Sequence, residues 1–364
     1  MERLNVGIIG AGMAFERLHY PAYQELSDKY QIAAVCDQDK VKAQQWAKKL
    51  GLTDRDVYSD YQQMANRPDL NIIDIMVPIS QNFVIAEEVA SIIGGMKKGI
   101  ILEKPLAPTL EQAEKCASLP RKYDVMMMIA ENYRYNEDPN RIRELVNRGE
   151  VGDVDYFLWN RVINYPEDMV KDTFLAKEWR QHPDFSGGIF YDSAVHDIAA
   201  IRHVFGPIDE LMAYGQQKPV TPNQYTVVHV VFRFKSGFTG SYIFYSGGKE
   251  IQRPLVGWRI IGQKGMIYQE ERDCGTINVY YNDGNSKQIP YRPQRGYYNE
   301  LLNFYNAFVG KEPLSVTPEL ELGDVRTILA ILESMEQETP VRVDEGDSPV
   351  PQYDPTRLNQ YFEH

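Results

Sequence analysis

The sequence predicts two domains: an α/β N-terminal domain with a doubly wound parallel sheet, and an α+β C-terminal domain with a large, mostly antiparallel open sheet. In the first third of the chain, short and almost continuously apolar runs alternate with polar, helix-forming stretches, and a glycine-rich loop follows the first run. Such runs are typical of a parallel sheet covered by helices on both faces. Farther along, longer alternating runs follow one another without helices, which indicates an antiparallel sheet with one covered face.

The elements of the first domain can be placed in order along the chain. Residues 5–9, 31–36, 71–77, 99–102 and 125–130 are predicted strands, and residues 40–50 and 109–118 are predicted helices. Strands alternating with helices in this way build a doubly wound Rossmann-type domain, which we place at residues 1–131.

The second domain is predicted at residues 132–343. Its strands are expected at residues 153–164, 225–234, 237–245, 256–262 and 266–269, and its helices at residues 140–147, 299–308 and 319–337. Ser236-Gly237 and Lys264-Gly265 are turn signals between these strands. Residues 344–364 contain three prolines and are expected to form an extended C-terminal tail.

Charge and composition exclude several classes of protein. Lys and Arg total 39 against 51 Asp and Glu, so the formal net charge is −12 among 364 residues. An acidic surface repels phosphate backbones and anionic membranes, so neither nucleic acid nor membrane is expected as a partner. We expect no signal peptide and no membrane helix, since no stretch reaches about 20 apolar residues. The odd, widely spaced cysteines Cys36, Cys116 and Cys274 favour reduced thiols and a cytoplasmic location.

The loop after the first strand has the spacing of a phosphate-binding turn. Gly10 permits a tight turn, and Gly12 lets a pyrophosphate approach the backbone of Met13 and Ala14, where a helix begins. Phe15 stands at the place of the usual third glycine, so the packing of this helix on the strand must differ. A plain pair of turn glycines is the alternative reading of this motif.

Asp37 ends the second predicted strand, 25 residues after Gly12. An acid at about this spacing hydrogen-bonds the ribose hydroxyls of an adenosine. It would also repel a 2′-phosphate, and no arginine follows it to neutralise one, so NAD is favoured over NADP. A helix N-cap before residues 40–50 is the alternative role for Asp37, and both roles are compatible.

Further landmarks carry a resemblance to a known family. They are Val77-Pro78, Glu103-Lys104-Pro105, the segment from Glu131 to Tyr135, Trp179-Arg180, Gly187-Gly188, Asp192 and His196. In this order they resemble the glucose-fructose oxidoreductase / inositol dehydrogenase / MocA family of NAD(P)-dependent oxidoreductases, and the resemblance extends from about residue 5 to 343. The sequence departs from the family pattern at Val77, Asn82 and Ala199, where threonine, histidine and aspartate are common.

The resemblance assigns catalytic roles to Lys104, Asp192 and His196. The spacing of Asp192 and His196 places both on one face if their segment is helical. A histidine is a suitable base for the hydroxyl proton that leaves as a hydride is transferred, and an ammonium can polarise that hydroxyl. The alternative reading is a surface lysine and an Asp–His pair that stabilises its helix.

The resemblance also implies which residues contact ligands. The cofactor site would comprise Gly10, Gly12, Met13, Ala14, Asp37, Pro78, Glu103, Lys104, Trp179 and Arg180. The substrate site would comprise Lys104, Tyr133, Arg134, Asp192 and His196. Packing at a domain junction is the alternative for Tyr133 and Arg134, and we interpret Gly187-Gly188 as a flexible hinge. No compact zinc-ligand spacing is evident around His182, Asp184 and His203, so no metal is expected.

These observations predict an NAD-dependent dehydrogenase acting on a CH–OH group of a polyol, sugar or sugar derivative. Two alternatives remain. Some members of the family are glycoside hydrolases that use a transient oxidation by NAD, and the fold also supports a non-enzymatic NAD-sensing regulator. Because the family commonly associates through its second sheet, a homo-oligomer, either dimer or tetramer, is expected.

Overall fold

The computed structural model describes residues 3–163, 183, 185–217, 225–247, 256–270 and 272–343. The expected tail at residues 344–364 lies outside them. The chain divides into two compact units. The first contains the residues up to Asn132 together with Gly296–Leu322, and the second contains Tyr133–Arg295 and the residues from Gly323 onward. The stretch Gly296–Leu322, which we expected in the second domain, therefore joins the first unit.

The first unit contains a six-stranded sheet in the order β3-β2-β1-β4-β5-β6, and every neighbouring pair is parallel. The strands are β1 (Leu4–Ile9), β2 (Tyr30–Cys36), β3 (Val57–Tyr58), β4 (Ile72–Ile75), β5 (Gly99–Glu103) and β6 (Met126–Ala130). The chain turns back across the sheet between β1 and β4, and ligands of open α/β sheets bind at such a switch point.

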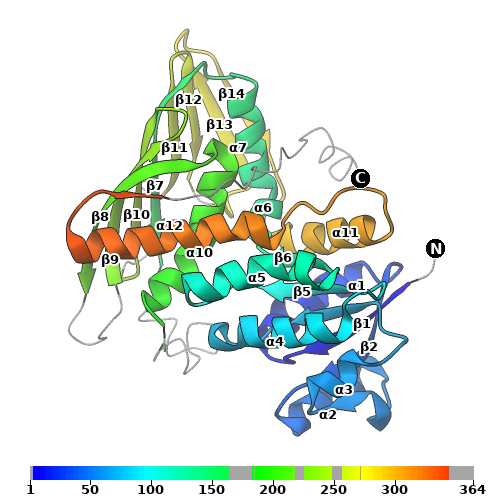
Figure 1. Cartoon of the computed structure of the whole chain (residues 1–364). Coiled ribbons are helices and arrows are strands. Elements are labelled where there is room, and N and C mark those ends of the chain that lie inside the picture. The colour runs from blue at the N-terminus through cyan, green and yellow to red at the C-terminus, as the bar shows by residue number, and fades with distance from the viewer. Residues whose placement is uncertain are drawn as a thin grey trace. The chain divides into compact units, whose positions relative to one another are not determined.

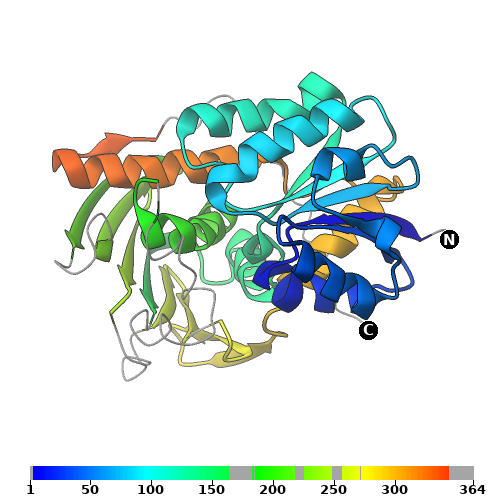
Figure 2. The same cartoon turned by 90° about the horizontal axis from the view of Figure 1, so that it is seen from below.

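Helices cover both faces of this sheet, which explains its continuous apolar strands. On one face lies a first set of helices, which contact β2, β6 or one another. On the opposite face lies a second set, the helices that follow β3, β4 and β5 along the chain (Figures 1 and 2). The first set is α1 (Tyr20–Glu25), α2 (Lys40–Leu50) and α11 (Gly296–Phe308). The second set is α3 (Tyr61–Ala65), α4 (Ile79–Ile93) and α5 (Leu110–Tyr123). Helix α11 belongs here because Tyr30 on β2 donates a hydrogen bond of 2.6 Å to the Leu301 carbonyl.

The second unit contains a nine-stranded sheet in the order β14-β13-β12-β11-β7-β10-β9-β8-β15, in which only β7 and β10 pair in parallel. The strands are β7 (Val154–Val162), β8 (Ile208–Gln217), β9 (Tyr225–Phe234), β10 (Thr239–Tyr245), β11 (Gly257–Gly262), β12 (Gly265–Gln269), β13 (Thr276–Tyr281), β14 (Ser286–Pro290) and β15 (Val341–Arg342). The predicted fold class is therefore confirmed. The sequence patterns did not identify β8, β13, β14 and β15.

One face of the second sheet is covered by helices, as the alternating pattern predicts. The helices are α6 (Asn132–Tyr135), α7 (Glu137–Asn147), α10 (Gly188–Phe205) and α12 (Pro318–Gln337), and Figure 1 shows α7, α10 and α12 along the same side of this sheet. In β9, buried and more exposed residues alternate. The covered face is rich in aromatic rings: Phe157 stacks on Phe205 of α10 at 4.6 Å. Burial of such rings is a major source of stability in a core of this kind.

A buried ion pair joins the helices of the second unit. Arg134 donates to both carboxylate oxygens of Asp324 at 2.9 and 2.7 Å, and Arg202 binds the same carboxylate. The two guanidinium groups lower the pKa of Asp324, although burial raises it. Removal of one partner from such a cluster leaves an uncompensated buried charge. Arg134 thus has a structural role in this unit, and its placement favours packing over the substrate contact that we expected.

Among the described residues, no helix combines the length and apolar character needed to cross a bilayer. All three cysteines are free, with Cys36 and Cys116 buried and Cys274 exposed.

Candidate active site

The glycine loop follows β1 at the carboxyl edge of the parallel sheet. Gly10 has φ +92°, and a Cβ there would lie 2.1 Å from the Met76 carbonyl oxygen, so a side chain is excluded. At Gly12, by contrast, a Cβ would meet no atom within 4 Å. The backbone at Gly12 therefore faces open space, as the approach of a pyrophosphate requires. Gly12, Met13 and Ala14 lead into the helical turn where free N–H groups can bind a phosphate.

The residue in place of the third glycine changes the first helical turn. Residues Phe15–His19 form a π-helical turn, η1, before α1 begins. The Phe15 ring is fully buried and contacts the ring of Trp46 on α2, with centroids 4.6 Å apart. A single wide turn of this kind is common beside functional sites. Here it accommodates a large side chain where a tighter helix would need glycine.

Asp37 connects the end of β2 to the glycine loop. Its Oδ2 accepts a hydrogen bond of 2.9 Å from the Ala11 N–H. The helix N-cap, which we considered for Asp37, is instead Asp39, whose carboxylate accepts from Val41 and Lys42 at the start of α2. Asp37 is thus free of the capping role and lies beside the loop, where an adenosine ribose would bind. The Lys42 Nζ lies 3.8 Å from its Oδ2, a cation that the sequence pattern did not reveal.

A buried histidine joins the helical turn after β1 to two neighbouring strands, β4 and β5. The His19 ring, on η1, lies 2.8 Å from Asp74 of β4 through Nδ1 and 2.9 Å from Glu103 of β5 through Nε2. Tyr23 donates a further hydrogen bond of 2.8 Å to Asp74. Burial lowers the pKa of His19, but the charges and hydrogen bonds of Asp74 and Glu103 more than offset this and hold the pKa well above its ordinary value. His19 is therefore an imidazolium that neutralises part of the buried negative charge.

Lys104 follows β5, and its backbone is held on both sides. The Asn82 side-chain amide donates to the carbonyls of Glu103 and Pro105, each at 2.9 Å. The Lys104 N–H donates to Glu103 Oε2 at 3.1 Å. Asn82 is fully buried on α4, one turn after Pro78, which is the N-cap of that helix. The departure from the family pattern at Asn82 thus supplies a clamp for the Lys104 backbone.

Asp192 and His196 lie one turn apart on α10, as predicted. Asp192 is buried and His196 is half-buried. The His196 ring stacks on the ring of Tyr133, with centroids 4.5 Å apart and planes at 15°. Tyr133 thereby restricts the orientation of the imidazole.

The two glycines before these residues begin α10. Gly187 is the N-cap with φ +81°, and a Cβ there would lie 2.9 Å from Leu332 of α12. Close helix packing and a left-handed backbone conformation explain these glycines, so the hinge that we expected is not needed.

The remaining sequence predictions have different outcomes. Trp179, Arg180, His182 and Asp184 lie outside the described residues. His203 is buried and its Nε2 lies 2.8 Å from Asn140 Oδ1. Within the described part of the chain, no group of three or more His, Cys, Asp or Glu side chains is arranged to hold a metal. Sequence reasoning missed His19 and Asp74, and it named Asn82 without predicting its hydrogen bonds on either side of Lys104, because these roles depend on contacts between distant strands and helices.

A parallel sheet with a glycine loop at the carboxyl ends of its strands is typical of a dinucleotide-binding protein, and here a second domain with its own sheet accompanies it. Residues 4–131 match the model of an oxidoreductase family with an NAD-binding Rossmann fold, and residues 140–268 match the GFO/IDH/MocA C-terminal domain. The chain belongs to the GFO/IDH/MocA family, as its motifs indicated, and is an NAD(P)-dependent oxidoreductase.

Similar proteins extend over nearly the whole chain. An uncharacterised protein of Saccharomyces cerevisiae is 26% identical, over 90% of this chain and 92% of its own length. A myo-inositol 2-dehydrogenase of Thermotoga maritima is 23% identical, over 94% of this chain and 99% of its own length. The crystal structure of an oxidoreductase from Thermotoga maritima has a TM-score of 0.81 at 25% identity, and the match covers 94% of this chain and 99% of that one.

The placement of Asp37 predicts a preference for NAD over NADP. Replacement of Asp37 by serine, together with Gln38→Arg, removes the anion that repels a 2′-phosphate and adds a cation. We expect the ratio of NADPH to NADH affinity to rise by about 10- to 100-fold, the scale of one charge-assisted hydrogen bond. Fluorescence titration with both nucleotides measures this ratio. Tighter binding of NADPH than NADH by the unaltered protein would contradict the assignment of Asp37.

Glu300 predicts a pH dependence of stability in the first unit. It lies on α11, both its carboxyl oxygens are buried, and neither has a hydrogen-bond partner among the described residues. Burial raises the pKa of Glu300 well above its ordinary value; His19 opposes this, and Glu103, Glu131 and Asp74 add to it. The folded state therefore favours the protonated Glu300 carboxyl. The free energy of unfolding falls as the pH rises from the pKa of Glu300 in the unfolded chain through its higher pKa in the folded protein.

We expect Glu300→Gln to match the unaltered protein near pH 4 and to become more stable relative to it as pH rises, by at most about 1.4 kcal/mol per pH unit. Urea unfolding at a series of pH values measures this difference. Glu111→Gln, at an exposed position of α5, serves as the control and should barely change the pH dependence. A constant difference between Glu300→Gln and the unaltered protein at all pH values would contradict the prediction.

Proposed function

We propose that the protein transfers a hydride between NAD and a CH–OH group of a polyol, sugar or sugar derivative. The observation that carries this proposal is the placement of Asp192 and His196 one turn apart on α10, together with the backbone of Lys104 held by Asn82. The family relative named as a myo-inositol 2-dehydrogenase supports a polyhydroxylated substrate.

The residues of the glycine loop fit the cofactor. Gly12 opens onto free space, and Asp37 lies beside the loop with a carboxylate suited to ribose hydroxyls. We propose that Gly10, Gly12, Met13 and Ala14 border the pyrophosphate. Pro78 follows β4, and Glu103 and Lys104 lie at the end of the neighbouring strand β5; these residues would border the nicotinamide half.

The chemistry requires a group that accepts the hydroxyl proton. When NAD is bound, it accepts the hydride from the carbon that carries the hydroxyl. We assign the proton to His196, and Asp192 orients the substrate or passes the proton on. The Lys104 ammonium hydrogen-bonds the reacting oxygen and stabilises negative charge on it. In the reverse direction the same groups return the proton to a carbonyl oxygen.

Two other functions predict different observations. A hydrolase that uses a transient oxidation would form no net NADH from its substrate. A regulator that senses NAD would bind the nucleotide without turnover. Net NADH formation from a free polyol or sugar, followed at the absorbance of NADH across a panel of such compounds, therefore tests the dehydrogenase directly.

Replacement of the proposed catalytic groups should separate turnover from cofactor affinity. We expect Lys104→Ala and His196→Ala each to lower kcat by about 10²-fold or more, the scale of one positioned acid–base group. The Kd for NAD should change little, and the double variant should lose less than the product of both effects. Steady-state kinetics and NAD titration provide the measurements.

Lys97→Ala, at an exposed position before β5, is the control with normal turnover. Near-normal kcat in the His196 variant would exclude the histidine as the base.

We also propose that the protein is a cytoplasmic homo-oligomer. Large apolar side chains on the uncovered face of the second sheet are exposed to solvent, with exposed fractions of 41–62%. They are Tyr156, Leu158, Tyr214, Val231 and Tyr280. The register places Val231, Ser241 and Leu158 in one row across β9, β10 and β7. Contiguous exposed apolar side chains on a sheet are typical of a protein interface. The buried free thiols support a reducing compartment.

A charge on this face should prevent assembly. We expect Val231→Asp to shift the molar mass, measured by light scattering after size-exclusion chromatography, toward that of one 41.9 kDa chain. Val309→Asp, at an exposed valine outside this sheet, is the matched control and should leave the mass unchanged. An unaltered protein that is already monomeric would contradict the proposed interface.

A further inference from the structure

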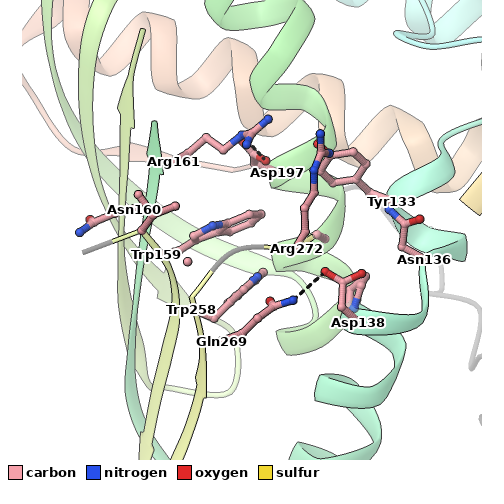
Figure 3. A pocket seen from close by; sticks show the side chains of 14 residues that line it. Tyr133, Asn136, Asp138, Trp159, Asn160, Arg161, Asp197, Trp258, Gln269 and Arg272 are labelled. Carbon is pink, nitrogen blue, oxygen red and sulfur yellow. Dashed lines mark hydrogen bonds and ion pairs between the residues drawn. The ribbon is translucent and has the colours of Figure 1, made fainter. Parts of the chain in front are cut away.

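A pocket in the second unit lies between the covered face of the sheet and the helices α6, α7 and α10. It is open to solvent on one side, and the empty space counted out to that side is about 460 Å³. Trp159, Trp258 and Gln269 form one wall, and Figure 3 shows their side chains in successive layers opposite Tyr133, Asp138 and Arg272. The strand register produces this wall, because Trp258 pairs with both Trp159 and Gln269.

The wall is apolar and rigid. The indole rings of Trp159 and Trp258 stack with centroids 4.0 Å apart and planes at 22°. The carbon atoms of such a stack that line the pocket form an apolar surface that can contact the CH groups of a ligand. Such a surface alone does not select a ligand, so the polar groups around it decide what fits.

One polar group in this wall has an unused hydrogen-bond capacity. The Gln269 side chain is fully buried, and its Nε2 donates to Asp138 at 3.1 Å and to the Tyr291 hydroxyl at 2.6 Å. Tyr291 in turn donates to the Arg272 carbonyl, which fixes the orientation of the amide. Gln269 Oε1 is buried and has no hydrogen-bond partner among the described residues. A buried acceptor that lines a pocket points to a donor on a ligand, such as a hydroxyl group.

Two guanidinium groups, those of Arg161 and Arg272, line the pocket together with the carboxyl groups of Asp138 and Asp197. Arg161 faces Asp197, with Nε 3.6 Å from Oδ1, and Tyr242 donates to the same carboxylate at 2.6 Å. Burial raises the pKa of Asp138 to about 7, against the hydrogen bond from Gln269, so this group carries only part of a negative charge near neutral pH. The Arg272 guanidinium lies 4.7 Å from the centre of the Tyr133 ring, and a guanidinium that lines a pocket can bind a carboxylate of a ligand through its several N–H groups.

The pocket adjoins the proposed catalytic histidine. Tyr133 lines the pocket and also stacks on the His196 ring, and Asp197 follows His196 on α10. The Tyr133 ring therefore links the pocket wall to the imidazole. This pocket is suited to the part of a substrate that does not react.

We propose that this pocket selects a sugar acid: the carboxylate binds Arg272, a hydroxyl group donates to Gln269, and the carbon chain lies on the Trp159–Trp258 stack. The assignment rests on the proposed function, because it identifies the pocket as part of the same substrate site. It names Arg272 and Gln269 as residues that determine specificity.

Tryptophan fluorescence tests binding without turnover, because two of the four tryptophans line the pocket. The probes are matched pairs: D-glucuronate with D-glucose, and D-gluconate with D-sorbitol, each titrated into the full chain with NAD present. We expect saturable changes with both acids and at least about 10-fold weaker binding of the neutral partners, the scale of one hydrogen bond to a charged group. Equal or tighter binding of the neutral compounds, or no saturable signal with either acid, overturns the proposal. Tighter binding of D-glucose 6-phosphate than of D-glucuronate overturns the choice of a carboxylate.

Variants then locate the carboxylate. Arg272→Met should weaken binding of the acids by about 10- to 100-fold and leave the neutral compounds unaffected, and Arg272→Lys should restore part of the loss. Arg233→Met, at a half-exposed arginine on β9 that pairs with Asp209 and Glu210, is the control that keeps normal affinity. Circular dichroism verifies folding of each variant, and Gln269→Met supplies a second test that does not alter charge. Unchanged affinity of the Arg272→Met variant for the acids overturns the assignment.

Kinetics distinguish this inference from the proposed function. If acids are oxidised, Arg272→Met should raise KM for them while kcat stays near normal, as expected for loss of binding that is equal in the ground and transition states. Oxidation of neutral polyols with no preference for acids supports the dehydrogenase and contradicts the sugar-acid pocket. Selective binding of acids with no net NADH from any alcohol supports the pocket and contradicts the dehydrogenase.

Discussion

The first unit depends on one buried imidazole. His19 links the turn after β1 to β4 and β5 through Asp74 and Glu103, and all three groups are largely removed from water. Two carboxylates buried without a cation would be strongly destabilising, so the protonated histidine makes this arrangement possible. The glycine loop and the Lys104 backbone follow directly from β1 and β5. Their relative placement is therefore fixed by the same interaction, with Asn82 adding a second restraint on Lys104.

The second unit depends on a different constraint, the alternation of side chains along its strands. Because successive residues point to opposite faces, Trp159 and Arg161 of β7 face the helices, whereas Tyr156 and Leu158 with the outer residues of β9 face away. The covered face forms the aromatic core and the pocket beside His196. The exposed face supplies the surface that we propose for assembly. In our proposals, one strand thus contributes both to the substrate pocket and to the surface for assembly.

The proposed chemistry combines rigid groups from separate parts of the sequence. Lys104 is restrained through its backbone, and His196 is restrained by the Tyr133 ring. Preorganised groups of this kind need little rearrangement as charge develops in a reaction. The pocket adds selectivity through groups that do not react, since Arg272 and Gln269 contact only the distal part of a ligand in our proposal.

The sequence by itself determined the features that depend on local geometry. The helix at Lys40–Leu50 was predicted with these bounds, and the spacing of Asp192 and His196 placed them on one helical face. The apolar runs predicted both sheets, because strand periodicity is a local property. The family was identified from motifs in order along the chain, and both of its domain models match.

Only the tertiary structure decided which polar groups meet. Arg134 pairs with Asp324, 190 residues away, and Gln269 with Asp138, 131 residues away. Asp37 contacts the glycine loop through the N–H of Ala11, 26 residues away. Gly296–Leu322 joins the first unit because α11 covers β6 and Tyr30 binds its backbone. Such contacts depend on strand order and register between distant segments, and periodicity within a single segment carries no information about either.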